Sequence, residues 1–204
     1  MTVLLWDTCV LYRFLNGHPP EYLDHLEEWL KELSAGKTQI FLSTVALAEI
    51  RPSRVKDTGK TPAQIVNAIS AAFRFVAPTS DIMSLAGYLR DQRYRQTDGP
   101  EDRAADRVLS LGDSIHLATG VALREEFGVQ ELILHSFDEG KNKGGESGKR
   151  NVPIVGFHNW CRDLQGDEEV QKVLELTIKK PDHPSCKLPT KNPNSTSSRK
   201  PPAS

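Results

Sequence analysis

The stretch Val3-Leu4-Leu5-Trp6-Asp7-Thr8, near the start of the chain, joins a short apolar run directly to an acidic residue. A continuous apolar run of this length is typical of a strand that is buried on both faces, as in a parallel sheet. An ionised carboxylate beside a buried segment is uncommon unless it is paired or bound to a metal. We therefore interpret Val3–Trp6 as a core strand and Asp7 as a candidate site residue.

Three further acidic residues stand in similar surroundings. Glu49 lies on a helix-like segment, Asp113 lies near the start of a long apolar helix, and Asp138 follows an apolar strand. In parallel α/β sheets ligands bind beyond the carboxyl ends of the strands, so we expect these three residues to converge there with Asp7. Four carboxylates at one place repel one another unless a cation offsets their charge, and hard oxygen ligands suit Mg²⁺ or Mn²⁺. The pattern favours a divalent-metal site and phosphodiester chemistry.

The rest of the chain alternates apolar runs with amphipathic segments. Strands are expected at Val3–Trp6, Gln39–Leu42, Phe73–Ala77, Glu131–Leu134 and Val152–Phe157. Helices are expected at Thr8–Leu15, from Pro20 to Leu33, around Glu49, at Ala63–Phe73, at Asp81–Arg95, and from Gly112 to Gly128. Strands that alternate with helices indicate a parallel sheet with helices on both faces. The predicted fold class is α/β, a three-layer α/β/α sandwich with a central, mainly parallel sheet.

The chain changes character near residue 166. We expect one folded domain over residues 1–165, a short charged helix within 166–179 (Glu168–Ile178), and a disordered tail over 180–204. The tail is rich in Pro, Ser, Lys and Asn, and such a composition buries too little apolar surface to offset the entropy of ordering.

Cysteine usage and hydropathy indicate the cellular compartment. Cys9, Cys161 and Cys186 are widely spaced, without a CxxC pair or a disulfide framework. The first residues lack the pattern of a secretory signal, and no apolar stretch approaches the ~20 residues that span a bilayer. We expect a cytoplasmic protein with no membrane association.

Four acidic motifs follow one another along residues 1–158. They are Leu5-Trp6-Asp7-Thr8, Ser43 with Leu47-Ala48-Glu49, Gly112-Asp113-Ser114-Ile115-His116-Leu117-Ala118-Thr119, and Leu134-His135-Ser136-Phe137-Asp138. Their order and spacing resemble those of a PIN domain, and they are most similar to the VapC-type toxin ribonucleases of bacterial toxin–antitoxin pairs. The resemblance implies an α/β/α sandwich and a Mg²⁺- or Mn²⁺-dependent endoribonuclease.

The resemblance also implies roles for particular residues and partners. Asp7, Glu49, Asp113 and Asp138 become the catalytic and metal-binding residues, and Ser136 occupies the position of the family's usual Thr. An antitoxin that covers the acidic cleft and a homodimer are implied as partners. The last acidic motif of the family is often richer than Ser-Phe-Asp-Glu, and this chain is longer than a compact toxin.

Three more polar side chains are supporting candidates. Thr8 and Ser136 place hydroxyls beside two of the acids, where they are positioned to hold metal-bound water. His116 lies three residues after Asp113 on one helix face and is either a catalytic acid or a hydrogen-bonded helix-face histidine.

A basic loop follows the last acid. Residues 1–178 carry a net charge of −6, so bulk charge does not favour nucleic-acid binding and a local basic patch would have to supply it. The loop offers Lys141, Lys143, Lys149 and Arg150 as contacts to an RNA backbone, since Lys and Arg bind phosphate without sequence preference. The alternative interpretation is a solvated, flexible loop.

Other classes of protein remain as alternatives. An aspartyl phosphatase would need a second Asp two residues after Asp7, where this chain has Cys9. A non-catalytic RNA-binding or interaction module of the same fold would be expected to have lost at least one of the acids, and all four are present. An RNA-processing nuclease without an antitoxin stays open.

Overall fold

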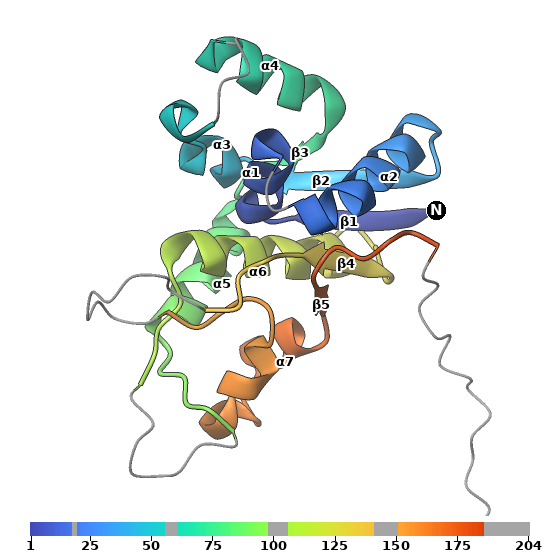
Figure 1. The fold of residues 1–204 in the computed structure, drawn as a ribbon. Coiled ribbons are helices and arrows are strands. Elements are labelled where there is room, and N and C mark those ends of the chain that lie inside the picture. Colours follow the sequence, from blue (N-terminus) through green and yellow to red (C-terminus); the bar gives the residue numbers. More distant parts are fainter. Residues whose placement is uncertain (18–19, 56–60, 98–105, 141–150, 186–204) are drawn as a thin grey trace, which may run out of the picture.

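A single five-stranded parallel sheet forms the centre of the molecule (Figure 1). The computed structural model describes residues 1–17, 20–55, 61–97, 106–140 and 151–185. The strands are β1 (Thr2–Trp6), β2 (Thr38–Ser43), β3 (Arg74–Val76), β4 (Leu132–His135) and β5 (Thr177–Lys179). They lie in the order β3-β2-β1-β4-β5, and every pair is parallel. The predicted fold class is therefore confirmed.

The first apolar run forms β1, the central strand of this sheet, and helices cover both of its faces. Leu4 and Trp6 pack on one face and Leu5 on the other, and all three side chains are fully buried. The helices against Leu4 and Trp6 are α1 (Thr8–Asn16), α2 (Leu23–Ser34) and α4 (Pro62–Ala72). Those against Leu5 are α5 (Ser80–Asp91), α6 (Leu111–Glu125) and α7 (Glu168–Leu174). Figure 1 shows these two groups above and below the sheet.

Helix α6 runs through the larger apolar core, and its first turn carries polar site candidates. Its residues from Ser114 to Leu123 are all buried. Ser110 caps the helix, since its hydroxyl accepts a hydrogen bond from the Asp113 N–H at 3.1 Å. The short helix α3 (Val45–Glu49) packs against α6 and follows β2 directly. Glu49 and Asp113 are thereby brought to the same edge of the sheet.

The expected strand at Val152–Phe157 is wrong. Val152 and Ile154 are fully buried, as their apolar character indicates, but the segment is irregular and ends in the 3-10 helix Phe157–Trp160. Pro153 has no N–H for a strand ladder, and Gly156 has a φ of 84°, which breaks an extended run. The apolar pattern predicted burial correctly and the secondary structure incorrectly.

The fifth strand comes from the segment expected as the end of a charged helix. Helix α7 ends at Leu174, and Thr177–Lys179 pairs with β4 at the edge of the sheet. Thr and Ile are β-branched and favour strands, and an available sheet edge decides between the two structures.

The start of the expected tail lies against α2. The indole N–H of Trp29 donates to the carbonyl of Asp182 at 2.7 Å, and His25 lies 3.3 Å from the carbonyl of Pro181. Residues 186–204, and with them most of the expected tail, lie outside the described residues. Within the described part of the chain, no helix is long and apolar enough to cross a membrane.

Candidate metal centre

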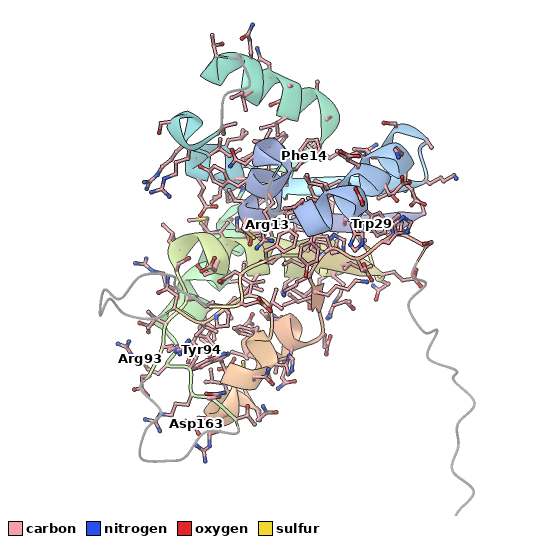
Figure 2. The ribbon with its side chains drawn as sticks, in the orientation of Figure 1. Arg13, Phe14, Trp29, Arg93, Tyr94 and Asp163 are labelled. Carbon is pink, nitrogen blue, oxygen red and sulfur yellow. The ribbon has the colours of Figure 1, made fainter. Side chains whose placement is uncertain are left out.

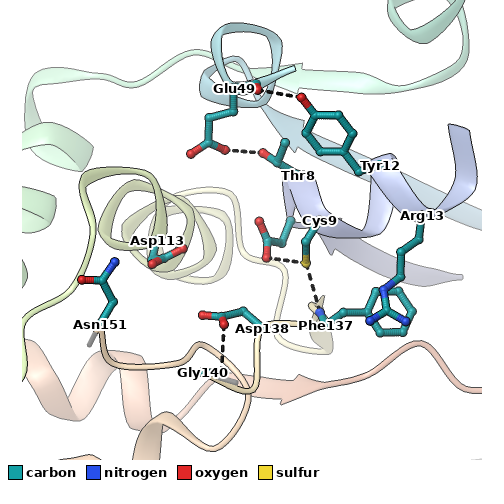
Figure 3. Close-up of a pocket in the computed structure, with 11 residues that line it drawn as sticks. Thr8, Cys9, Tyr12, Arg13, Glu49, Asp113, Phe137, Asp138, Gly140 and Asn151 are labelled. Carbon is teal, nitrogen blue, oxygen red and sulfur yellow. Dashed lines mark hydrogen bonds between the residues drawn. The ribbon is translucent and has the colours of Figure 1, made fainter. Parts of the chain in front are cut away.

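An open cleft of about 490 Å³ lies where the strand order changes direction, between β1 and β4 (Figure 3). The chain leads from β1 to β2 on one side and places β4 on the other, and ligands bind at such switch points in α/β sheets. All four predicted acids, Asp7, Glu49, Asp113 and Asp138, are among the residues that line the cleft. Their role in binding a metal stays a prediction.

Asp7 lies at the floor of the cleft, directly after β1. Its N–H donates to the carbonyl of His135 at 3.0 Å, which continues the pairing of β1 with β4. Its carboxylate accepts hydrogen bonds from the Ser136 hydroxyl at 2.7 Å and from the Cys9 thiol at 2.8 Å. Although Asp7 stands at the N-cap position of α1, its side chain makes no capping bond. A carboxylate that is 5% exposed and held at one oxygen is oriented toward the cleft rather than used to start the helix.

Glu49 reaches the same place from the end of α3. One carboxylate oxygen accepts from the Thr8 hydroxyl at 2.5 Å and lies 3.2 Å from the His116 Nε2 atom. Burial acts to raise the pKa of Glu49, but the hydrogen bonds from His116 and Thr8 outweigh it and lower the pKa from its usual value. Tyr12 fixes the backbone here, because its hydroxyl donates to the Glu49 carbonyl at 3.0 Å and accepts from the Arg51 N–H.

Gly112 provides the space that the Glu49 carboxylate occupies. A Cβ atom at this position would lie 1.9 Å from one Glu49 carboxylate oxygen. Any other residue at position 112 would therefore force the Glu49 carboxylate to move.

The His116 side chain lies between the carboxylates of Asp7 and Glu49. It is 1% exposed, and its Nε2 atom lies 3.5 Å from Asp7, 3.2 Å from Glu49 and 3.1 Å from the Thr8 hydroxyl. Burial disfavours its charged form, but the bond to Glu49 and the charges of the neighbouring acids outweigh burial and raise the pKa of His116. Its Nδ1 atom is buried without a hydrogen-bond partner. His116 thus contacts both Asp7 and Glu49, which its position on the helix alone did not indicate.

Asp113 differs in its surroundings. Its carboxylate accepts from the Ser110 hydroxyl at 2.6 Å. Burial raises the pKa of Asp113 to about 6, with a further rise from the negative charges of Asp7 and Asp138, while the Ser110 bond opposes the shift. At neutral pH this group is ionised against its surroundings, which is the situation that a bound cation would relieve.

Asp138 has its carboxylate engaged by the backbone. Its two oxygens accept from the N–H groups of Gly140 at 3.0 Å and Ile154 at 3.2 Å. Its own N–H donates to the Ser136 hydroxyl at 3.0 Å. Gly140 has a φ of 68°, as a tight turn here requires. Asp138 therefore holds together the loop after β4 and the segment at Ile154, besides lining the cleft.

The donor set fits a divalent ion. One oxygen each from Asp7 and Glu49 and one nitrogen from His116 lie within 4.8 Å of one another. Carboxylate oxygens suit Mg²⁺ or Mn²⁺, and an added imidazole nitrogen favours the transition metal of the two. The hydroxyls of Thr8 and Ser136, expected beside metal-bound water, hydrogen-bond instead to Glu49 and Asp7. The basic candidates Lys141, Lys143, Lys149 and Arg150 lie outside the described residues.

Several residues of the cleft were missed from the sequence. They are Cys9, Tyr12, Arg13, Phe137, Gly140 and Asn151, which line it, and Gly112, which makes room for Glu49. Helical spacing offered one signal, since Tyr12 lies four residues after Thr8 and Arg13 four residues after Cys9 on α1. No sequence signal distinguished Gly112 or Asn151.

Comparisons with known proteins give little direct information on family. No protein-family model matches this sequence, and no curated protein matches it significantly. Among solved structures, it is similar to the crystal structure of VapBC2 from Rickettsia felis bound to a DNA fragment from their promoter. The match has 13% identity and a TM-score of 0.45, and it covers 89% of this chain and 100% of that chain. At this identity and TM-score, the likeness does not determine the family of this chain.

Proposed function

We propose that this protein is a metal-dependent endoribonuclease that hydrolyses phosphodiester bonds of RNA. The observation that carries the proposal is the convergence of Asp7, Glu49 and the buried His116 at one open cleft, which is lined by Asp7, Glu49, Asp113 and Asp138. The cluster lies at the carboxyl edge of a parallel sheet, which is where ligand sites are expected in this class of fold. The choice of RNA rests on the resemblance of the acidic motifs to those of PIN-domain ribonucleases.

Each residue has a definite task in this proposal. Asp7 and Glu49 would hold the ion, with His116 as a third ligand or as the donor that fixes both carboxylates. When bound, a Mg²⁺ or Mn²⁺ ion would polarise the scissile phosphate and make water a better nucleophile at neutral pH. Ser136 and Thr8 fix the directions of the two carboxylates before any ion arrives. Preorganised ligands avoid the cost of rearrangement on metal binding.

Asp113 and Asp138 border the space where the substrate phosphate would lie. The raised pKa of Asp113 reflects burial beside like charges, and a nearby ion would lower it again. We assign Asp113 to the metal or to its bound water. Asp138 we assign chiefly to shaping the wall, because backbone N–H groups already occupy both of its oxygens.

The resemblance extends the proposal to partners and compartment. We infer a cytoplasmic toxin, paired with an antitoxin that covers the cleft, and a homodimer in solution. Growth arrest on expression, reversed by co-expression of a protein that binds this chain, would support the toxin assignment. Unimpaired growth with active enzyme would favour an RNA-processing nuclease without an antitoxin. Sedimentation of the purified chain as a monomer would contradict the homodimer.

The nuclease proposal is tested with the purified protein, single-stranded and structured RNA, and Mg²⁺, Mn²⁺ or EDTA. Cleavage that requires the metal and is lost in Asp7→Asn supports it. Failure to bind either ion by calorimetry, together with no cleavage, would contradict it and favour the non-catalytic module.

A further inference from the structure

Among the described residues that line the cleft, Arg13 is a cation and the other charged side chains are acids. It lines the cleft together with Asp7, Glu49, Asp113 and Asp138. Figure 3 shows its side chain beside Phe137, at the opposite end of the cleft from Asp113 and Asn151. Among the ion pairs found between described residues, none involves Arg13. Its charge is therefore available to a ligand in the cleft.

Two aromatic rings hold the guanidinium group. It lies 3.8 Å from the centre of the Phe137 ring and 5.8 Å from the centre of the Tyr22 ring. The rings themselves meet edge to face, with centres 4.9 Å apart. Stacking fixes the plane of an arginine but leaves its in-plane N–H donors unused, and these donors match the oxygens of a phosphate.

The position of Arg13 is tied to the metal-binding acids by the covalent chain. Phe137 lies between Ser136, which hydrogen-bonds to Asp7, and Asp138, and its N–H donates to the Cys9 thiol at 3.1 Å. Arg13 itself lies on the α1 helix that begins immediately after Asp7. The segments that carry Arg13, Phe137 and the proposed metal ligands are therefore joined by hydrogen bonds and by the chain itself.

A second cation lies close to Arg13. The pKa of Lys180 is raised by its ion pair with Glu139, at 2.7 Å, while burial and the positive charge of Arg13 oppose the rise. The Glu139 carboxylate offsets the charge of Lys180, so among the described residues that line the cleft Arg13 is the one that supplies positive charge. Carboxylates that line a cleft repel an anionic chain such as RNA. Positive side chains or a bound metal ion are needed to attract it.

We propose that Arg13, held by Phe137 and Tyr22, binds a backbone phosphate of single-stranded RNA next to the phosphate that is cleaved. This inference rests on the proposed ribonuclease function. It assigns Arg13 as a substrate-binding residue that gives affinity without sequence preference, because phosphate contacts position a nucleic acid and do not read its bases.

The test compares Arg13→Gln and Arg13→Lys with wild type and with a matched control, Arg93→Gln. Arg93 is exposed after α5, far from Arg13, as Figure 2 shows, so its replacement removes the same charge elsewhere. Binding of a fluorescent single-stranded RNA is measured by anisotropy at several KCl concentrations, with Ca²⁺ present. Mn²⁺ affinity is measured by calorimetry, and folding by circular dichroism.

We expect Arg13→Gln to weaken RNA binding about tenfold and to reduce the slope of log affinity against log salt by about 1. Arg13→Lys should recover part of the RNA affinity. Arg93→Gln should bind RNA as wild type does, and every variant should bind Mn²⁺ with wild-type affinity. Equal affinity and salt slope for Arg13→Gln and Arg93→Gln would overturn the inference and leave the nuclease proposal intact. RNA binding that depends on Arg13 in a protein that neither binds Mn²⁺ nor cleaves RNA would support phosphate binding by Arg13 and contradict the nuclease proposal, and with it the placement next to a cleaved phosphate. A wild-type protein that binds no RNA would overturn both.

Discussion

The two pairs of acids in the cleft have different hydrogen-bond partners. Asp7 and Glu49 each accept side-chain hydrogen bonds, from Ser136 and Thr8, and His116 lies between them. In the second pair, the partly buried Asp113 accepts from the Ser110 hydroxyl, while Asp138 is engaged by two backbone N–H groups. The first pair is arranged to present oxygens to a ligand. The second pair divides into one carboxylate under electrostatic strain and one that stabilises a loop.

Replacing Asp7 should have the largest effect. Asp7→Asn keeps an acceptor for Ser136 but removes the negative charge that lies 3.5 Å from the His116 Nε2 atom. We expect cleavage to fall on the order of 10³-fold and Mn²⁺ affinity to fall with it. Cleavage rates and calorimetry measure both, and a variant with wild-type cleavage would remove the first pair from the site.

The position of Glu49 can be changed without changing Glu49. Gly112→Ala places a Cβ atom 1.9 Å from a Glu49 carboxylate oxygen, so the flexible glutamate side chain has to move. We expect cleavage to fall about 10- to 100-fold, because a misplaced ligand weakens both the metal and the chemistry. Thermal stability should change little.

A glycine on α5 gives the matched control for this variant. Nothing lies within 4 Å of a Cβ atom at Gly87, so Gly87→Ala makes the same helical substitution without a collision. It should retain full activity and gain up to about 1 kcal/mol of stability. Equal activities for the two alanine variants would show that Gly112 does not position Glu49.

Asp113 is predicted to be unfavourable for folding. Because its folded pKa is about 6 and its usual value is 3.8, the folded state binds more protons than the unfolded state between those values. The contribution of Asp113 to stability is therefore highest below pH 3.8 and is lost as pH rises to 6. Asp113→Asn should stabilise the metal-free protein by about 1–3 kcal/mol above pH 6 and by progressively less toward pH 4. Denaturant unfolding at several pH values tests this, and a destabilised variant at pH 7 would contradict it.

Asp138 should show the opposite sign with a smaller magnitude. Asp138→Asn turns one acceptor into a donor that faces the N–H of Gly140 or Ile154. We expect a loss of about 1–2 kcal/mol of stability, measured by denaturant unfolding without metal. If Asp138→Asn stabilised the protein, as predicted for Asp113→Asn, the proposed difference between Asp113 and Asp138 would be wrong.

Part of this cleft was predictable from local pattern. The apolar run before Asp7 identified a core strand, and the strand order then placed the residues after β1 and β4 at one edge of the sheet. The expectation for Asp138 was less complete, since its hydrogen bond to Ile154 joins residues 16 positions apart. The same limit explains the error at Val152–Phe157, where the apolar pattern reports burial but not hydrogen-bond partners.

The sequence by itself determined the elements whose signals are local. The alternation of apolar runs with amphipathic helices gave the parallel α/β sheet, and the four acids stood out because charge beside buried segments is costly. Only the tertiary structure decided which neighbours those acids have. It added β5 to the sheet edge, placed Gly112 against Glu49, and set Arg13 over Phe137. These contacts join residues far apart in the chain, and their energies depend on packing in three dimensions, which no local pattern records.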